Sequence, residues 1–244
     1  MIKPHVRGLA IRFVVLSLVG AAIILTQKSD AARYSYDNVA ISAIIPEASI
    51  PKLDRQTYIF LTEYGKQLRE IGNEYGIDWR LSLAVLRQES AFDPEATSDK
   101  GASGLMQLMP ETGMRLAIVN NVDDISDPVE NIKLGSIHLR DMLREFSDSE
   151  GDDRIELAVA AYNCGEGRVQ DAQAVAEFLD DPPNTWTAVK SALPVLSERY
   201  SPLHAHIWGT GKPTFGTFGA YEQTLTYVEN VMHYYNIYRN VLHE

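Results

Sequence analysis

A glutamate, Glu89, stands at the end of the apolar stretch LSLAVLRQES, where a charged side chain is costly to bury. Apolar surroundings disfavour the charged form of a carboxyl group and raise its pKa, so such a glutamate can hold its proton near neutral pH. A protonated carboxyl group can give that proton to the leaving oxygen of a glycosidic bond. A glutamate that ends a helix on its solvated side would give the same local pattern, so this stretch alone leaves both interpretations open.

Further acidic side chains follow Glu89 within a short distance along the chain, and one of them could act as a second catalytic group. Ordinary glycosidases pair the acid with another carboxylate, which serves as nucleophile or base. The spacing does not choose among these residues, nor does it exclude a reaction that needs one carboxylate. The four candidates are Asp93, Glu95, Asp99 and Glu111.

Downstream motifs place Glu89 in a wider pattern. They are Ser98 with GASGLMQLMPET (residues 101–112), AYNCGEGRV (residues 161–169) and the pair Tyr227–Val228. Together with ESAF at residues 89–92, they resemble the lysozyme-like catalytic domain of lytic transglycosylases, over roughly residues 60–240. The segments WTAVKSALPVLSERY and YVENVMHYYNIY look most like the membrane-bound type F subgroup. That subgroup elsewhere carries a solute-binding-like domain ahead of the catalytic one, which is not expected in this sequence.

The resemblance implies an all-α fold, a single catalytic domain of the goose-type lysozyme class. It also implies cleavage of the β-1,4 bond between N-acetylmuramic acid and N-acetylglucosamine in peptidoglycan, with a 1,6-anhydromuramic acid product and no cofactor. A second carboxylate is unnecessary in that family, because the N-acetyl group stabilises the cation-like intermediate and the glutamate then deprotonates the C6 hydroxyl. The alternatives are a goose-type hydrolase with the same fold, and a catalytically silent glycan-binding or secretion-assembly module.

The resemblance assigns roles to residues around the catalytic Glu89. Ser98 resembles the serine whose hydroxyl helps to orient the acid and the N-acetyl group, and Tyr227 matches the tyrosine that reaches toward the acid. The remaining substrate-binding residues are expected to line the sugar cleft or hold its loops: Gln107, Met109, Tyr162 and Asn163. For Met109, packing in the core is an open alternative. Two positions depart from the family: Cys164 replaces an alanine, and Gln223 replaces a glutamate one helical turn before Tyr227.

Helices must position these residues, and the apolar spacing predicts them. One helix is expected from Arg55 to Gly76, and the next begins at the cap Asp78 and ends at Glu89–Ser90. An N-cap acid followed by proline, Asp127–Pro128, predicts another helix start. Further helices are expected over residues 155–163 and 221–242, and the acidic segment 147–153 is expected to form a solvated turn. Met106 and the aromatic residues Trp186, Trp208, Tyr234, Tyr235 and Tyr238 are expected to pack in the core.

The N-terminal residues 1–31 have basic side chains followed by an uncharged run, Phe13–Thr26. This pattern predicts a secretory signal peptide, with an uncleaved membrane anchor as the alternative. Residues 32–54 are expected to be a linker or arm, and residues 55–244 the lysozyme-like transglycosylase domain. The expected location is therefore the periplasm or cell envelope, with either inner- or outer-membrane association and with peptidoglycan glycan strands as partner. Protein partners are not indicated.

Charge and histidine pattern exclude other classes of function. The formal net charge is −11, which repels nucleic-acid phosphates, so no nucleic-acid partner is expected. His204 and His206 stand close together without a cysteine partner or an HExxH pattern, so no metal site is expected.

Overall fold

The computed structural model describes residue 45 and residues 52–242 of the 244-residue chain. The predicted signal peptide or anchor, residues 1–31, lies outside the described residues, as does most of the predicted linker, residues 32–54. Of that linker, Ile45 is fully buried and Asp54 caps the first described helix. None of the helices in the described part of the chain has the length and apolar character that crossing a membrane requires.

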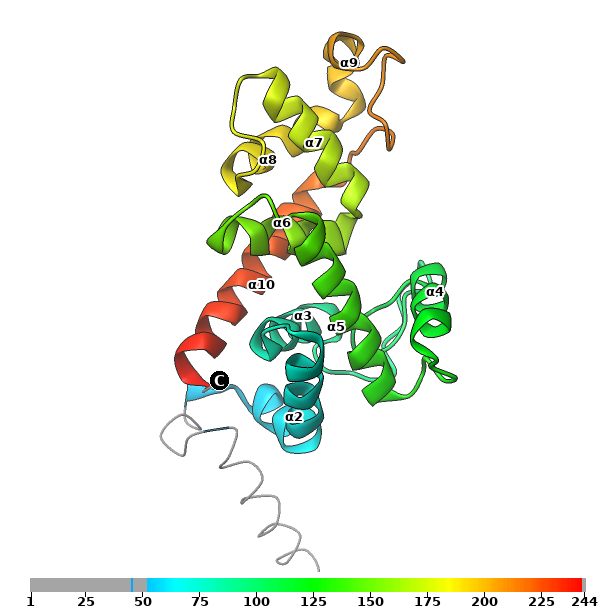
Figure 1. Ribbon diagram of the computed structural model, residues 1–244, viewed down its shortest axis with the longest axis vertical. Coiled ribbons are helices and arrows are strands. Elements are labelled where there is room, and N and C mark those ends of the chain that lie inside the picture. The colour runs from blue at the N-terminus through cyan, green and yellow to red at the C-terminus, as the bar shows by residue number, and fades with distance from the viewer. Residues whose placement is uncertain (1–44, 46–51, 243–244) are drawn as a thin grey trace, which may run out of the picture.

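Residues 52–242 are mainly helical and contain no named strand, which confirms the predicted all-α class (Figure 1). The α-helices are α2 (Arg55–Tyr75), α3 (Trp79–Ser90), α4 (Pro110–Asn120), α5 (Pro128–Glu145), α6 (Gly151–Cys164), α7 (Glu166–Phe178), α8 (Trp186–Ala192), α9 (Ser201–Ile207) and α10 (Tyr221–Val241). Two short 3-10 helices, Leu193–Leu196 and Glu198–Tyr200, join α8 to α9.

Aspartate caps set the starts of the helices around the site, as predicted. The Asp78 carboxylate accepts a hydrogen bond from a backbone amide of the first turn of α3, and Asp127 accepts two such bonds at the start of α5. A side-chain oxygen at this position satisfies amides that the first turn leaves without an intrahelical partner. With α3 beginning at Trp79, Glu89 falls in its last turn, next to the left-handed Ala91 that ends the helix.

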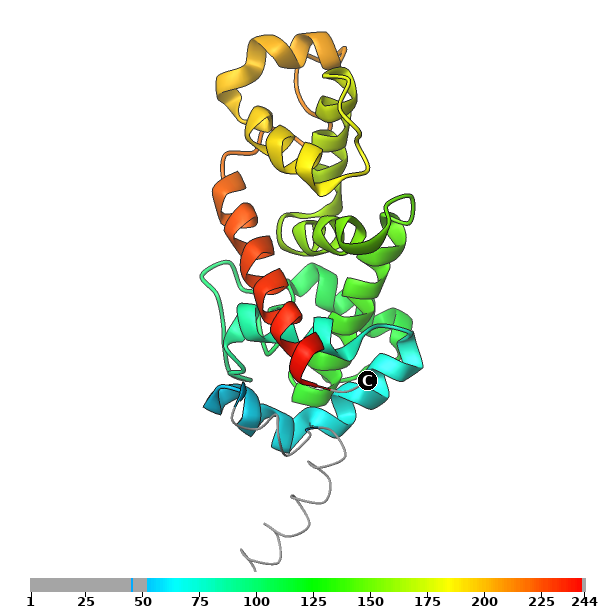
Figure 2. The same cartoon turned by 90° about the vertical axis from the view of Figure 1, so that its left-hand side faces the viewer.

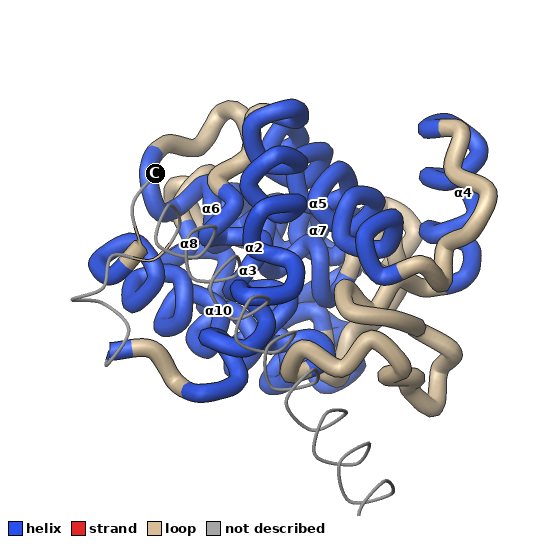
Figure 3. Tube along the Cα trace, turned by 90° about the horizontal axis from the view of Figure 1, so that it is seen from below, coloured by secondary structure: helices blue, strands red, loops and turns tan. Residues whose placement is uncertain are grey.

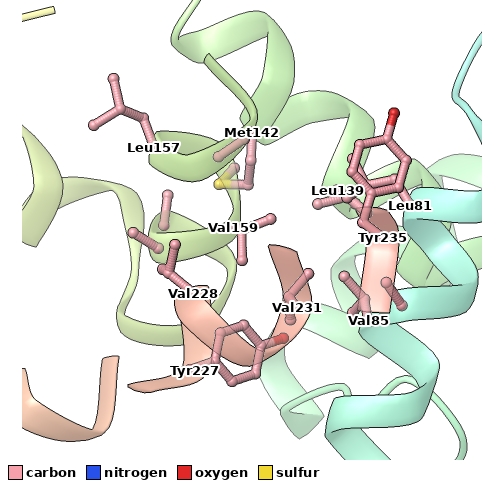
Figure 4. Packing of buried hydrophobic residues seen from close by; sticks show 14 of the residues in the cluster. Leu81, Val85, Leu139, Met142, Leu157, Val159, Tyr227, Val228, Val231 and Tyr235 are labelled. Atoms are coloured by element: carbon pink, nitrogen blue, oxygen red, sulfur yellow. The ribbon is translucent and has the colours of Figure 1, made fainter. Parts of the chain in front are cut away.

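The centre of the molecule is the contact of α10 with α3 and α6. Val228 and Val231 of α10 lie between Val159 of α6 and the apolar residues Leu81 and Val85 of α3 (Figure 4). All five side chains are at most 2% exposed. Each buried aliphatic side chain of this size stabilises the fold by about 1.5–3 kcal/mol. This packing holds the last helix of the chain firmly against the helix that carries Glu89.

The molecule is elongated, with α7, α8 and α9 at one end and α2, α3 and α5 at the other (Figure 2). Helix α4 lies at the edge of the molecule and packs against α5 (Figure 3). The loop of residues 91–109 connects α3 to α4 and is fastened by isolated bridges of Ser103 with Thr97 and Leu108. This loop brings the GLMQLM motif toward the end of α3.

Two expectations need correction. The acidic segment 147–153 is a turn only as far as Glu150, because α6 begins at Gly151 and includes Asp152 and Asp153. Acidic side chains in a first turn interact favourably with the positive end of the helix dipole, so Asp152 and Asp153 favour this early start of α6. Trp208 is half-buried rather than fully buried, and it packs against the core from its edge, whereas Tyr234 is half-buried and packs against the core as predicted. Trp186, Tyr235, Tyr238 and Met106 are buried, as predicted.

Candidate active site

The carboxyl group of Glu89 is withdrawn from water although the residue keeps a partly exposed surface. Its Oε1 accepts a hydrogen bond from the Tyr227 hydroxyl at 2.6 Å, across 138 residues of sequence. Burial raises the pKa of Glu89 to about 7, and the Tyr227 hydrogen bond opposes that rise. At neutral pH this group is therefore divided between its acid and base forms, which suits a residue that must both give and take a proton.

Two tyrosines stand beside this carboxyl group. Tyr227 is buried on α10, and the half-buried Tyr162 on α6 donates its hydroxyl proton to the Met106 carbonyl at 2.8 Å. Burial, followed by repulsion from Glu89, raises the pKa of both phenols well above the usual value. Both hydroxyls therefore stay protonated at neutral pH, and Tyr227 acts as a donor to Glu89.

A cleft of about 470 Å³ opens beside these tyrosines, and we call it the main cleft. One wall comes from the loop before α4 and from α4 itself, and the other from the end of α6 and the start of α7. Its lining residues are Gln107, Leu108, Met109, Thr112, Arg115, His138, Ala161, Tyr162, Asn163, Cys164, Gly165, Glu166, Gly167, Arg168 and Phe215. The predicted residues Gln107, Met109, Tyr162 and Asn163 are thus brought together in one concave surface.

Gln107 and Met109 reach the cleft from a loop whose backbone is fixed. The Gln107 side-chain amide donates to the carbonyls of Ala96 and Gly104, both at 2.9 Å. Gln107 itself has a φ of 46°, a left-handed conformation that such hydrogen bonds must hold in place. Met109 is 43% exposed and lines the cleft, so it is not a core residue.

Gly104 explains why the loop approaches α5 so closely. Its φ is 76°, and a Cβ at this position would lie 2.5 Å from the Asn131 side-chain nitrogen. The Asn131 amide oxygen in turn accepts a hydrogen bond from the Met106 amide at 2.9 Å. The absence of a side chain at Gly104 therefore permits this close approach, and Asn131 is the residue that requires it.

Ser98 is held within the same loop. Its hydroxyl oxygen accepts a hydrogen bond from the Ala102 amide at 3.0 Å, and its own amide donates to the Ala102 carbonyl at 2.9 Å. These bonds close a tight turn around Gly101, whose φ is 84°. Ser98 is not among the residues lining the main cleft, and its expected action on the N-acetyl group stays a prediction.

A second groove, of about 460 Å³, lies on the α10 side of Asn163. It is lined by Gln88, Asn163, Glu222, Gln223, Thr226 and Tyr227. The Asn163 side-chain oxygen accepts a hydrogen bond from the Thr224 hydroxyl at 2.8 Å, which fixes the residue that borders both cavities. Gln223 and Tyr227 line the same groove, as their spacing of one helical turn predicts.

The other candidate carboxylates do not join Glu89. Asp93, Glu95, Asp99 and Glu111 are exposed, whereas Glu89 is half-buried. None of these five acids lines the main cleft or the second groove, and Glu89 is connected to the two cavities through Tyr162, which lines the main cleft, and Tyr227, which lines the second groove. Asp93 instead accepts a hydrogen bond from the Glu95 amide at 3.0 Å. Within the described ranges, no group of three or more histidine, cysteine, aspartate or glutamate side chains is arranged to hold a metal ion.

Sequence reasoning missed several residues of the main cleft, notably Arg115, His138, Arg168 and Phe215. The His138 ring lies 5.0 Å from the Tyr162 ring, between centroids. Burial, followed by the nearby Arg115, lowers the pKa of His138 to about 4, so its imidazole is neutral at physiological pH. The sequence did not indicate that His138 lines a cleft. Its neighbours on α5 are apolar, and that pattern predicts packing against the core.

The comparisons with known proteins agree with this geometry. Residues 67–184 match the family described as Transglycosylase SLT domain. The membrane-bound lytic murein transglycosylase F of Stutzerimonas stutzeri is 37% identical over 180 residues, which are 72% of this chain and 34% of that protein. Its counterpart in Desulfosudis oleivorans is 31% identical over 189 residues, 77% of this chain and 39% of that protein. The chain thus spans about a third of the length of these relatives.

Solved structures show the same likeness. The 70 kDa soluble lytic transglycosylase of Escherichia coli matches with a TM-score of 0.52 and 25% identity, covering 77% of this chain and 26% of that one. An inactive glutamate-to-glutamine variant of the Pseudomonas aeruginosa enzyme Slt matches with a TM-score of 0.53 and 27% identity, covering 74% of this chain and 24% of that one.

Proposed function

Residues 67–184 belong to the transglycosylase SLT domain family, and on that premise we propose that this chain is a peptidoglycan lytic transglycosylase. It would cleave the β-1,4 bond between N-acetylmuramic acid and N-acetylglucosamine and leave a 1,6-anhydromuramic acid end. The observation that carries the proposal is Glu89, a desolvated carboxyl group with a pKa of about 7 that accepts a hydrogen bond from Tyr227, a residue that lines the second groove.

In the first step, protonated Glu89 gives its proton to the glycosidic oxygen as the bond to the muramic C1 breaks. The N-acetyl group of the same sugar stabilises the positive charge that develops at C1. Glu89 is then ionised, and the hydrogen bond from Tyr227 stabilises this form at 2.6 Å. Burial alone would make ionisation costly, so Tyr227 keeps the two forms of the acid close in free energy.

In the second step, the Glu89 carboxylate takes the proton of the muramic C6 hydroxyl. The C6 oxygen then attacks C1 and closes the anhydro ring, and Glu89 is protonated again for the next cycle. Atoms balance without water, so no second carboxylate is required. The exposed positions of Asp93, Glu95, Asp99 and Glu111 support this one-carboxylate route.

The remaining site residues would bind the glycan. Gln107 and Met109 would form one wall, and Tyr162 and Asn163 the other, because they line opposite sides of the main cleft. Ser98 would act from the loop turn that its hydroxyl closes with Ala102. We further propose that the protein works in the cell envelope after export directed by residues 1–31, either cleaved or retained as an anchor.

Mass spectrometry of the fragments released from purified peptidoglycan by the full chain tests the proposal. Anhydromuramic ends on the released muropeptides are the expected result. Reducing ends would instead identify a hydrolase of the goose-lysozyme type. Release of no fragment, with binding to glycan retained, would identify a silent binding module. A Glu89→Gln variant purified in the same way is the control for contaminating enzymes.

A further inference from the structure

Phe215 is a large apolar residue that is 54% exposed, and it lines the main cleft. It belongs to the loop between α9 and α10, which descends beside α7 (Figure 1). None of the sequence motifs includes this residue. Covering an exposed aromatic ring releases roughly 25 cal/mol per Å² of apolar surface removed from water, so a ligand in the cleft would gain by packing against it.

The Phe215 ring is seated on a glycine. A Cβ at Gly167 would collide with the nearest atoms of the ring, so a larger residue there would force the ring to move. Gly167 is a buried residue in the first turn of α7 and lines the same cleft. The ring therefore rests against backbone on one side, and much of its remaining surface is open to solvent.

A buried carboxylate fixes the loop at this same point. Asp171 of α7 is 2% exposed, and its two oxygens accept hydrogen bonds from the amides of Thr214 at 3.0 Å and Phe215 at 2.8 Å. An ionised acceptor makes such bonds stronger than those between neutral groups. A buried carboxylate is stable only when it is paired in this way. The loop is thus held in one conformation at the residue that presents the ring.

We propose that Phe215 is a stacking platform for a pyranose ring of the glycan strand, in a binding subsite at the α7 side of the main cleft. This inference rests on the proposed function, which supplies a glycan as the occupant. Sugar rings have one face of C–H groups, and a flat aromatic surface buries such a face well. The main cleft also contains Tyr162, which lies near Glu89, and Asn163, which borders the second groove as well, so a strand bound at the acid can extend to Phe215.

Binding to glycan strands tests this subsite without relying on turnover. Each variant is made in a Glu89→Gln background, and its affinity is measured for purified long strands from which an amidase has removed the peptide stems. Phe215→Ala should weaken binding about tenfold, equivalent to about 1.4 kcal/mol, whereas Phe215→Tyr, which keeps the ring, should bind as the parent does. Phe178→Ala is the matched control, because Phe178 is 47% exposed at the end of α7 and does not line the cleft.

A second variant tests how the platform is held. Asp171→Asn retains the Phe215 ring but weakens its anchor, so hydrogen exchange at the Thr214 and Phe215 amides should accelerate and strand affinity should fall. Circular dichroism and thermal unfolding verify that the variant is folded. Faster exchange with unchanged affinity would overturn the positioning role of Asp171.

The platform itself is overturned if Phe215→Ala binds stem-free strands as tightly as Phe178→Ala does. It is also overturned if Phe215→Ala loses affinity only for strands that keep their stems, because the ring would then contact peptide. The proposed function fails by a different result, namely that the chain with Glu89 intact releases no fragments. In active protein, Phe215→Ala should raise KM for long strands about tenfold and leave kcat unchanged.

Discussion

Two glutamates of this protein, Glu89 and Glu156, are half-buried and have their pKa raised to about 7, for different reasons. At Glu89 burial is the cause, and a hydrogen bond from Tyr227 opposes it. At Glu156 burial is joined by repulsion from Asp153 and Asp152, with Lys190 opposing. A raised pKa by itself therefore does not identify an acid catalyst in this chain.

The surroundings distinguish the two regions. The two tyrosines near Glu89 line cavities: Tyr162 lines the main cleft, and Tyr227, whose hydroxyl is 2.6 Å from the Glu89 carboxyl group, lines the second groove. Glu156 lies in an acidic group on α6 whose members serve the fold. Asp153 accepts a hydrogen bond from the Trp186 backbone amide at 2.8 Å, and Asp152 forms an ion pair with Arg239 at 3.5 Å. Burial is the largest cause of the raised pKa at both glutamates, so the neighbours distinguish them: Glu89 has tyrosines that line cavities, and Glu156 has acids that make structural contacts.

The largest expected difference between the two regions is in catalysis. Glu89→Gln should lower the rate of glycan cleavage by at least about 10²–10⁴-fold, because the amide keeps the shape but cannot give or take the proton. Glu156→Gln should leave the rate within about twofold of the unmodified protein, since a surface change away from the cleft perturbs it little. Release of muropeptides from purified peptidoglycan measures both. Equal losses in the two variants would remove the basis for choosing Glu89.

The pH dependence sharpens the comparison further. Cleavage begins with protonated Glu89, so kcat/KM should fall as pH rises above about 7. Tyr227→Phe removes the hydrogen bond that favours the ionised form, so the pKa of Glu89 should rise and the alkaline fall should move to higher pH. The rate at the optimum should drop about 10- to 100-fold, because a hydrogen bond to a charged group is worth about 1.5–3 kcal/mol. An alkaline limb that moves to lower pH would contradict the assigned role of Tyr227.

The smallest expected effect concerns stability at Glu156. Its folded pKa is raised above the unfolded value, so the stabilisation from the protonated group is complete at low pH and is lost as pH rises through about 7. Glu156→Gln removes this loss, so above pH 7 the free energy of unfolding of the variant should be higher by up to about 1 kcal/mol. The gain is limited to this size because solvent screens a half-exposed side chain. Urea unfolding at pH 8 measures the gain.

The matched measurement at pH 4 should show no difference, since Glu156 is then protonated in both states. A variant less stable than the unmodified protein at pH 8 would mean that the ionised Glu156 makes a favourable contact that burial and repulsion do not outweigh.

Local rules were enough for the parts of the fold that depend on neighbouring residues. Asp78 and Asp127 begin helices as their types predict, and the apolar run before Glu89 is the buried face of α3. Helices α7, α8 and α9 could not be bounded in this way. Helix α7 lacks a side-chain cap and mixes alanine with polar residues, while α8 and α9 are too short for a periodic pattern.

The site divides in the same manner. The segment around Glu89 showed an acid at the end of an apolar run but left its role open, and its contact with Tyr227, which spans 138 residues, came only from the resemblance to a family. Ser98 was predicted by that match, yet its hydroxyl is engaged by Ala102, a detail of loop geometry that spacing does not contain. Phe215 was missed because an aromatic residue in an irregular loop has no pattern until Asp171 and Gly167 are placed beside it.

The packing of α10 across α3 also determines when, during synthesis of the chain, Glu89 acquires its folded environment. Ribosomes produce the chain from its N-terminus, so Glu89 emerges long before Tyr227, and contacts so distant in sequence form late in folding. Without α10, the Glu89 carboxyl group lacks the hydrogen bond from Tyr227 and the packing of α10 against α3. A nascent chain, or one truncated before Tyr227, therefore lacks part of the environment that sets the acidity of Glu89 in the folded protein.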